Sequence, residues 1–423
     1  MKNLLKTKMP FSFYGLRRYA GSAGWSLFGK LITMSIGLFA TLYIARALGP
    51  TNFGELSYAL SFIALFSFIA SLGIDNVLYR ELVKNPGQKN FLLGSALVIK
   101  LTTGSGAAVL AILTAWILSS PDVSLLLIAL LSITFISQSV FFISYEFGAA
   151  VKARAVALLS IFVVIVINFL KIGAIYLGGG VIYLAIILVF ESLLYAIGYI
   201  FIRQRTFGTL REWKFDLSTT KGLLIDSWPY MFITAFALIY SRVDQVLLKN
   251  LIDSTEVGLY DAAVRLSELW YFIPTLLAGS LLPALINAKQ HSLEDYIHRF
   301  ILLILLSFGL AVSIAIGVYL LAPTIVHVIY GPDFVGTAGI LRIYIWALIP
   351  MSLIIVINQF FLAENERFMI FVSAFSGMFI NIVANIWLIP LYQGIGAAIA
   401  TLISSCVMVA VSTLLYVVYK RLS

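Results

Sequence analysis

Long apolar stretches separated by short polar turns run along almost the whole chain. The first stretch covers residues 22–45 and carries a single charge, Lys30. Gly49-Pro50 then interrupts the pattern, and a second apolar stretch begins near Leu56. Because a helix rises about 1.5 Å per residue, each stretch can cross a hydrocarbon core of about 30 Å. Proline cannot continue a helix beyond its first turn, so we predict a hairpin of two membrane helices.

The same pattern recurs to the C-terminus and predicts about twelve transmembrane helices in an all-α integral membrane protein. Continuous apolar stretches argue against a membrane β-barrel, whose strands alternate apolar and polar positions. Beyond the hairpin we expect spans at 91–118, 123–144, 155–177, 181–202, 223–248, 262–286, 300–321, 339–362, 368–389 and 394–419.

The longest polar connector divides these spans into two bundles of six helices. The expected organisation is a cytoplasmic interfacial segment (1–21), an N-terminal six-helix bundle (22–202), a cytoplasmic connector (203–222), a C-terminal six-helix bundle (223–419) and a cytoplasmic tail (420–423).

Internal repeats support two similar halves. A shift of 213 positions aligns Arg154 with Arg367 and Asn168 with Asn381. The hairpin motif also returns in part at residues 251–260, where a glycine stands in the place of Gly54. Six spans per half give equivalent helices the same orientation, so the pseudo-axis is expected along the membrane normal.

Composition agrees with a polytopic membrane protein. The 423 residues are 61% hydrophobic and 11% charged, and the mean hydropathy is +1.02. Soluble globular proteins do not have this composition. The single cysteine, Cys406, excludes an intrachain disulfide.

The formal net charge of +9 resides mostly in short loops, so it indicates orientation and contact with the membrane surface rather than nucleic-acid binding. With both termini in the cytoplasm, the loops on the other side of the membrane receive only Arg46 and Lys249. One missed or extra span would destroy this asymmetry. We therefore expect both termini on the cytoplasmic side.

Three connections between spans resemble those of a known transporter family. They are Arg46-Ala47-Leu48-Gly49-Pro50 with Phe53-Gly54, then Tyr330-Gly331-Pro332-Asp333-Phe334, then Ile389-Pro390-Leu391-Tyr392-Gln393-Gly394. Their order and spacing resemble the polysaccharide-export branch of the multidrug/oligosaccharidyl-lipid/polysaccharide (MOP) exporter superfamily, and within it the O-antigen flippases. Lipid II flippases share that fold, but the arginine-aspartate signature of their first span is not found here.

The resemblance implies a V-shaped pair of bundles, like that of MATE transporters, around a central cationic cavity. It implies a flippase that moves undecaprenyl-diphosphate-linked oligosaccharide across the bacterial inner membrane by alternating access. The implied partners are this lipid-linked substrate, membrane lipids and other polysaccharide assembly proteins, with no nucleic acid.

Charges inside the predicted spans are the candidate functional residues, because a charge at the bilayer centre costs about 2.5 kcal/mol or more. Cations outnumber carboxylates, which suits an anionic diphosphate. The candidate substrate-binding residues are Lys30, Lys100, Lys171, Arg242, Arg265 and Arg342, and the candidate ion-coupling residues are Glu191, Asp226 and Asp244.

Structural roles for some of these residues remain open. Arg265 and Glu268 are spaced i,i+3 and could neutralise each other. Arg342 and Lys100 could be interfacial side chains that snorkel from helix ends. Asp226 lies near the start of its helix, where a carboxylate stabilises the N-terminus.

Two other functional classes fit the sequence less well. A cation-coupled multidrug exporter of the same superfamily would favour carboxylates and aromatic residues in its cavity. A membrane polymerase or glycosyltransferase would need a sizeable outer loop with catalytic residues, whereas the longest one expected here, about 322–338, is mostly apolar. The sequence has no phosphate-binding loop, and its three histidines lack metal-ligand spacing, so we expect no enzyme activity, no metal and no cofactor.

Overall fold

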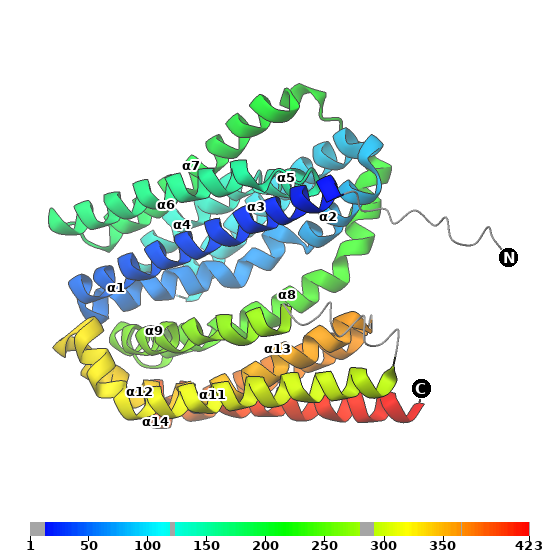
Figure 1. The fold of residues 1–423 in the computed structure, drawn as a ribbon. Helices are drawn as coiled ribbons and strands as arrows, with labels where there is room; N and C mark the ends of the chain where they lie inside the picture. Colours follow the sequence, from blue (N-terminus) through cyan, green and yellow to red (C-terminus); the bar gives the residue numbers. More distant parts are fainter. Residues whose placement is uncertain (1–12, 119–122, 280–291, 365, 423) are drawn as a thin grey trace.

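The computed structural model describes residues 13–118, 123–279, 292–364 and 366–422. Within these ranges the chain forms helices and no strand. The helices form two groups, the N-lobe and the C-lobe (Figure 1). The N-lobe contains α1 (Phe13–Ser71), α2 (Ile74–Lys84), η1 (Pro86–Gln88), α3 (Lys89–Leu118), α4 (Val123–Gln138), α5 (Ile143–Ala149), α6 (Ala153–Tyr176) and α7 (Val181–Phe207).

After η2 (Leu210–Glu212), the chain continues into the second group of helices. The C-lobe contains α8 (Leu217–Leu251), α9 (Ser254–Glu268), η3 (Leu269–Tyr271), α11 (Leu293–Tyr330), η4 (Pro332–Phe334), α12 (Val335–Tyr344), η5 (Ile345–Ala347), α13 (Leu348–Ala363) and α14 (Arg367–Leu422).

Two of the longest helices are each broken at one residue. In α1 the backbone of Gly49 adopts φ 72°, which glycine tolerates, and Pro50 begins the next stretch. In α14 the break lies at Gln393, with φ 54°, three residues after Pro390. The break in α1 lies where the sequence predicts it.

The number of membrane crossings agrees with the sequence. Nine helical segments of the described residues are long and apolar enough to cross a membrane, and two of them contain the breaks in α1 and α14. Counting each side of a break separately, and adding α9 with its helical continuation at 272–279, agrees with the prediction of about twelve spans. The protein is therefore a multi-pass, all-α membrane protein.

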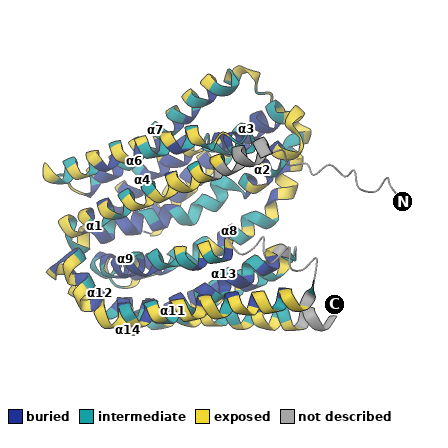
Figure 2. Ribbon diagram, in the orientation of Figure 1, coloured by how far each residue is buried: buried dark blue, intermediate teal, exposed yellow. Residues whose placement is uncertain are grey.

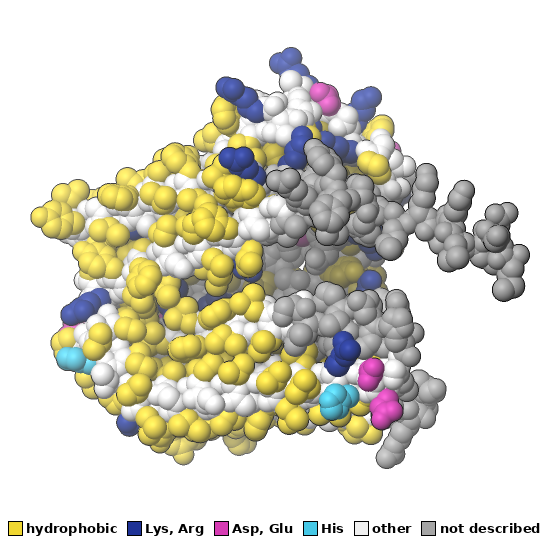
Figure 3. All heavy atoms as spheres, viewed as in Figure 1, with side chains coloured by type: hydrophobic (Ala, Val, Ile, Leu, Met, Phe, Trp, Pro, Cys, Tyr) yellow, Lys and Arg dark blue, Asp and Glu magenta, His cyan; other side chains and the backbone are white. Residues whose placement is uncertain are grey.

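The outer faces of both lobes are apolar. Figure 2 shows exposed residues along the outward sides of the helices, and Figure 3 shows that hydrophobic side chains cover the middle of this face. Large exposed side chains include Phe169, Tyr176, Trp387 and Leu391. Such a surface suits lipid, because lipid tails are as apolar as the side chains.

The two lobes share an apolar core at one end of the molecule, and at the other end the start of α8 contacts α2 and α3. We call the end that contains Gly49 and Gln393 the Gly49 end, and the end that contains α2 and residues 208–216 the linker end. At the Gly49 end one apolar core includes residues of both lobes, such as Phe53 and Tyr260. At the linker end each lobe has a core of its own. The lobes therefore form the predicted V, and Figure 3 shows a hollow between them.

A buried ionic cluster holds the link between the lobes against the N-lobe. Arg203 of α7 is completely buried (0% exposed), and its Nε lies 3.3 Å from Oε2 of Glu146 in α5. Glu146 forms a second ion pair with Lys89. Arg203 also donates to the carbonyl of Gly208 (2.7 Å), and its guanidinium lies over the ring of Trp213. This cluster fixes both ends of residues 208–213 to the N-lobe.

Helix α8 begins on the N-lobe and ends in the C-lobe. The hydroxyl and backbone N–H of Thr219 donate to Asp216 and hold the pKa of that carboxyl below its usual value, so a charged cap starts the helix. Leu223 belongs to the N-lobe core, and Asp226 pairs with Arg80 of α2. The irregular link is 208–216, shorter than the expected connector 203–222, because α7 continues to Phe207.

Candidate functional site at the Gly49 end

The closest contact between the lobes joins two glycines. We call the contact of residues 50–61 of α1 with α8 and α9 the seam. A Cβ atom on Gly54 would lie 1.7 Å from the carbonyl oxygen of Ser254, and one on Gly258 would lie 2.0 Å from that of Pro50. Only glycine fits at either position. The two glycines that the sequence matches as equivalents therefore face each other.

Polar side chains cross the seam along about three turns of α1. The hydroxyls of Thr51 and Thr255 lie 2.9 Å apart, and Nζ of Lys249 lies 2.5 Å from Oε1 of Glu55. Farther along α1, Ser61 donates to the side chain of Gln245. These contacts join the lobes where lipid offers no alternative partner.

Asp261 is a buried carboxylate of the seam, 1% exposed, with three side-chain partners. Its Oδ2 accepts from Ser57 of α1 (2.7 Å) and from Nε of Arg265 (2.6 Å), one turn farther along α9. Its Oδ1 accepts from Nε2 of Gln245 in α8 (2.9 Å). Arg265 therefore pairs with Asp261 at i,i−4, and not with Glu268 as the i,i+3 spacing suggested.

Arg265 has N–H donors that its ion pair with Asp261 does not use. Its guanidinium lies over the ring of Phe53 at 5.5 Å, and its side chain is 33% exposed. Among the described residues, neither Nη atom has a hydrogen-bond partner. The side chain is thus fixed at Nε while its two Nη groups stay uncommitted, an arrangement that suits two oxygens of one phosphate.

Two other candidates lie near Arg265. Arg242 of α8 is partly buried, and its charge interacts with those of Asp244 and Glu268. Asp244 is 3% exposed, accepts from the hydroxyl of Tyr260, and accepts from the backbone N–H of Gln245 at 2.8 Å. The structure therefore brings Arg242, Asp244 and Arg265 together on α8 and α9.

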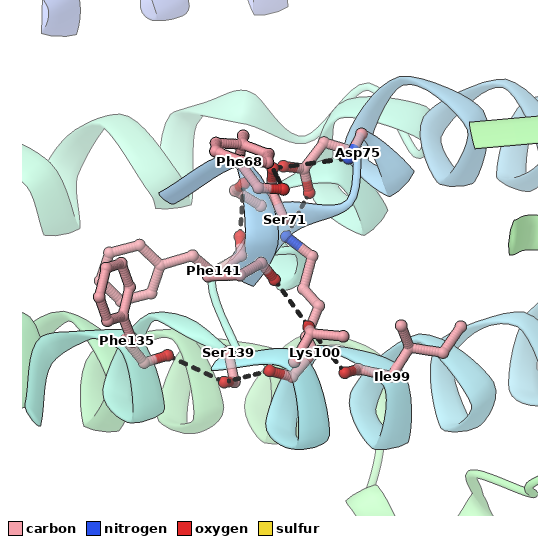
Figure 4. A network of polar contacts seen from close by, with 12 residues as sticks. Phe68, Ser71, Asp75, Ile99, Lys100, Phe135, Ser139 and Phe141 are labelled. Atoms are coloured by element: carbon pink, nitrogen blue, oxygen red, sulfur yellow. Dashed lines mark hydrogen bonds and ion pairs between the residues drawn. The ribbon is translucent and has the colours of Figure 1, made fainter. Parts of the chain in front are cut away.

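Lys100 lies apart from this group, inside the N-lobe. Its Nζ is 2.5 Å from Oδ1 of Asp75 at the start of α2, and its side chain is 9% exposed. Figure 4 shows Lys100 reaching from α3 toward Asp75, while Ser139 bonds the backbone oxygens of Lys100 and Phe135. The pair borders a cavity of about 260 Å³. Lys100 is thus neutralised by a partly exposed carboxylate.

The remaining candidates are dispersed, and two of them pair with each other. Lys171 of α6 lies 2.9 Å from Glu191 of α7. Arg342 is exposed, donates to the backbone of Tyr319 and lies over its ring. Lys30 is exposed and borders a cavity of about 300 Å³ between α1, α5 and α6.

Sequence reasoning did not identify Asp261 or Gln245. Asp261 and Arg265 are spaced i,i+4, so helical spacing alone could have indicated the ion pair. Gln245 carries no such signal, because its partners Ser61 and Asp261 lie on other helices.

Comparison with known proteins places the chain in a family. Residues 20–289 match the family described as polysaccharide biosynthesis protein. The chain belongs to that family. A probable flippase, AglR of Haloferax volcanii, is 25% identical over 182 residues, which are 39% of this chain and 35% of that protein. The match thus spans about a third of that relative.

Solved structures share the fold of this family member. An inward-facing multidrug resistance MATE transporter of the MOP superfamily has a TM-score of 0.74 at 13% identity, covering 92% of this chain and 96% of that one. The lipid II flippase MurJ in an inward closed conformation has a TM-score of 0.74 at 18% identity, covering 92% and 86%. An outward-facing MATE transporter has a TM-score of 0.60 at 14% identity, covering 94% of each chain. The fold is therefore that of MATE and MurJ transporters, as predicted.

Proposed function

We propose that the protein is a flippase that moves a lipid-linked oligosaccharide, carried on undecaprenyl diphosphate, across the bacterial inner membrane. The observation that carries the proposal is Arg265, a cation at the closed end of the V whose two Nη groups lack partners among the described residues. Membership in a polysaccharide biosynthesis family and the probable flippase among its relatives support it. These relatives are transporters, in agreement with the expectation of no enzyme activity.

The diphosphate would bind first to Arg265, whose Nη groups stay uncommitted although its Nε pairs with Asp261, and to cations without an ion pair among the described residues. Arg265 supplies a fork for phosphate oxygens, and Arg242 adds charge nearby. Lys30 and Arg342 also lack an ion pair within the described residues, whereas Lys100 and Lys171 are neutralised by Asp75 and Glu191. The last two would contribute only after their carboxylates move away.

Asp244 is the strongest of the three candidates for ion coupling. Glu191 and Asp226 form ion pairs with Lys171 and Arg80, so their charge is already balanced. Asp244 is buried, and its neighbours donate neutral hydrogen bonds. A carboxylate in this position can exchange a proton or hold a cation as the lobes move.

The Gly49 end would face away from the cytoplasm, with the V open to the cytoplasm and both termini there. Charge asymmetry supports this orientation, because basic residues concentrate at the opposite end. Reporters that are active only outside the cytoplasm should be active when fused after Gly180 or Asp253, and inactive after Arg211 or Arg367. The reverse pattern would refute the orientation, and a mixed pattern would refute the order of spans.

Binding of undecaprenyl diphosphate tests the substrate class. Arg265→Ala should weaken binding by about 1.5–3 kcal/mol, the value of a hydrogen bond to a charged group, or roughly 10- to 150-fold. Arg265→Lys should bind with intermediate affinity, because the charge remains and the fork is lost. Arg299→Ala, an exposed cation at the start of α11, is the control and should bind normally.

A further pair of measurements separates the flippase from a multidrug exporter. The TM-scores to a MATE transporter and to MurJ are both 0.74, so the fold alone does not distinguish the two functions. Lipids that co-purify with the protein are identified by mass spectrometry, and transport of a cationic dye is measured alongside. Transport of the dye, with no affinity for undecaprenyl diphosphate, would replace the proposal by the exporter.

A further inference from the structure

One oxygen of Asp261 joins the candidate substrate site to the opposing lobe. Oδ2 accepts from Arg265 on its own helix and from Ser57 across the seam. Oδ1 accepts from Gln245, whose side-chain oxygen accepts in turn from Ser61 of α1. Both oxygens of this buried carboxylate are therefore tied, directly or through one amide, to the N-lobe.

The charge of Asp261 is balanced within the C-lobe. Its cation, Arg265, and its amide partner, Gln245, both belong to helices of that lobe. The contacts that cross to α1 come from two neutral hydroxyls, Ser57 and Ser61. Separation of the lobes at the seam would break these contacts without leaving the buried carboxylate unpaired, which would be far more costly.

The carboxylate also sets the direction of Arg265. Nε is bonded to Oδ2, whereas the Nη groups have no hydrogen-bond partner among the described residues and stay available. A phosphate bound to those groups would draw the guanidinium toward itself, and Oδ2 would follow its strongest donor. Ser57 shares the same oxygen, so its hydrogen bond weakens as the carboxylate turns.

We propose that Asp261 is a positioning residue that orients Arg265 toward an anionic head group and holds Ser57 of the opposing lobe with the same oxygen, so that occupation of Arg265 opens the seam. This inference rests on the proposed function. It assigns to Asp261 the coupling between substrate capture and the change of access. Linkage requires the reverse effect as well, so that an opened seam binds the phosphate more tightly.

The seam can be followed with a cysteine pair. Cys406→Ser removes the only native cysteine, and Thr51→Cys with Thr255→Cys places two thiols where the hydroxyls lie 2.9 Å apart. Oxidation joins them only while the seam is closed, and alkylation followed by mass spectrometry counts the thiols that remain. Undecaprenyl diphosphate in detergent micelles is the probe, and its affinity is measured on the same samples.

When Asp261 is intact, the probe should slow cross-linking about tenfold. Loss of the hydrogen bond from Ser57 to the charged carboxylate of Asp261 favours the open seam by about that factor. Ser57→Ala should slow cross-linking without the probe by a similar factor while binding the probe at least as tightly. Asp261→Asn should slow cross-linking, weaken probe binding about tenfold and abolish the response to the probe. Asp261→Glu should restore part of the response. Ser313→Ala, which removes an exposed hydroxyl of α11, is the control and should change neither measurement.

The results separate a failure of the coupling through Asp261 from a failure of the proposed flippase function. If Arg265→Ala binds the probe as well as the parent does, the proposed function fails. If probe binding depends on Arg265 but the probe does not slow cross-linking, the inference is overturned. It is also overturned if Ser57→Ala, which leaves the ion pair of Asp261 in place, cross-links at the parental rate, and this result does not depend on whether Asp261→Asn folds.

Discussion

Replacing Gly258 with alanine is expected to reduce transport to the level of cells that lack the protein. The new Cβ would lie 2.0 Å from the carbonyl oxygen of Pro50 and 3.1 Å from the backbone nitrogen of Gly54. These are main-chain atoms, so no side chain can rotate away and α1 must separate from α9. Small residues permit such close helix contacts in membranes, and a single methyl group removes this one. Restoration of surface polysaccharide in a deletion strain measures the effect.

The control for this experiment is Gly309→Ala in α11, where an added Cβ meets no atom within 4 Å. It should transport normally, and both variants must reach the membrane in equal amounts. Cross-linking of Thr51→Cys to Thr255→Cys should disappear in the Gly258 variant only. Normal transport by Gly258→Ala would mean that tight closure of the seam is not part of the cycle.

Breaking the ion pair of Arg203 and Glu146 is expected to produce the largest loss of stability. Both side chains are buried, with 1% and 2% exposed. Removal of one partner from a buried pair costs about 3–5 kcal/mol, and the low end of that range is expected here because Lys89 still pairs with Glu146. Arg203→Ala should therefore lower the unfolding midpoint in detergent strongly. Arg205→Ala, an exposed cation two residues farther along α7, should leave it nearly unchanged.

A double substitution identifies the cause of that loss. Arg203→Met combined with Glu146→Gln removes both charges and keeps most of the volume. Replacing a buried pair as a whole is far less costly than removing one member, so the double variant should be more stable than Arg203→Ala. If it is equally unstable, the contacts of Arg203 with Gly208 and Trp213 matter more than its charge.

The membrane spans could be predicted from the sequence, because the thickness of the bilayer sets the length of the apolar stretch that crosses it. The break at Gly49 also followed from local chemistry, since glycine with a following proline favours a turn. The repeat also identified Gly54 and Gly258 as equivalent positions. What the repeat could not indicate is that the two equivalent positions touch.

The partners of the charged residues could not be predicted in the same way. In a soluble helix the polar side faces water, whereas these helices are apolar on the sides that face lipid as well as on those that face protein. The sequence therefore leaves the rotation of each helix undetermined. Lys171 and Glu191 are 20 residues apart on neighbouring helices, and only the rotation of α6 against α7 makes them a pair. The same holds for Lys100 and Asp75.

The position of α8 has a consequence for any attempt to express the protein as two halves. A gene cut within residues 208–216 would yield an N-terminal fragment whose core lacks Leu223 and whose Arg80 lacks Asp226. Fragment complementation would then require the first turns of α8 to dock onto the N-lobe before that lobe is complete. The internal repeat suggests two separate modules. The cooperative folding unit is nevertheless larger than either one, because α8, the first helix of the C-lobe, begins within the N-lobe.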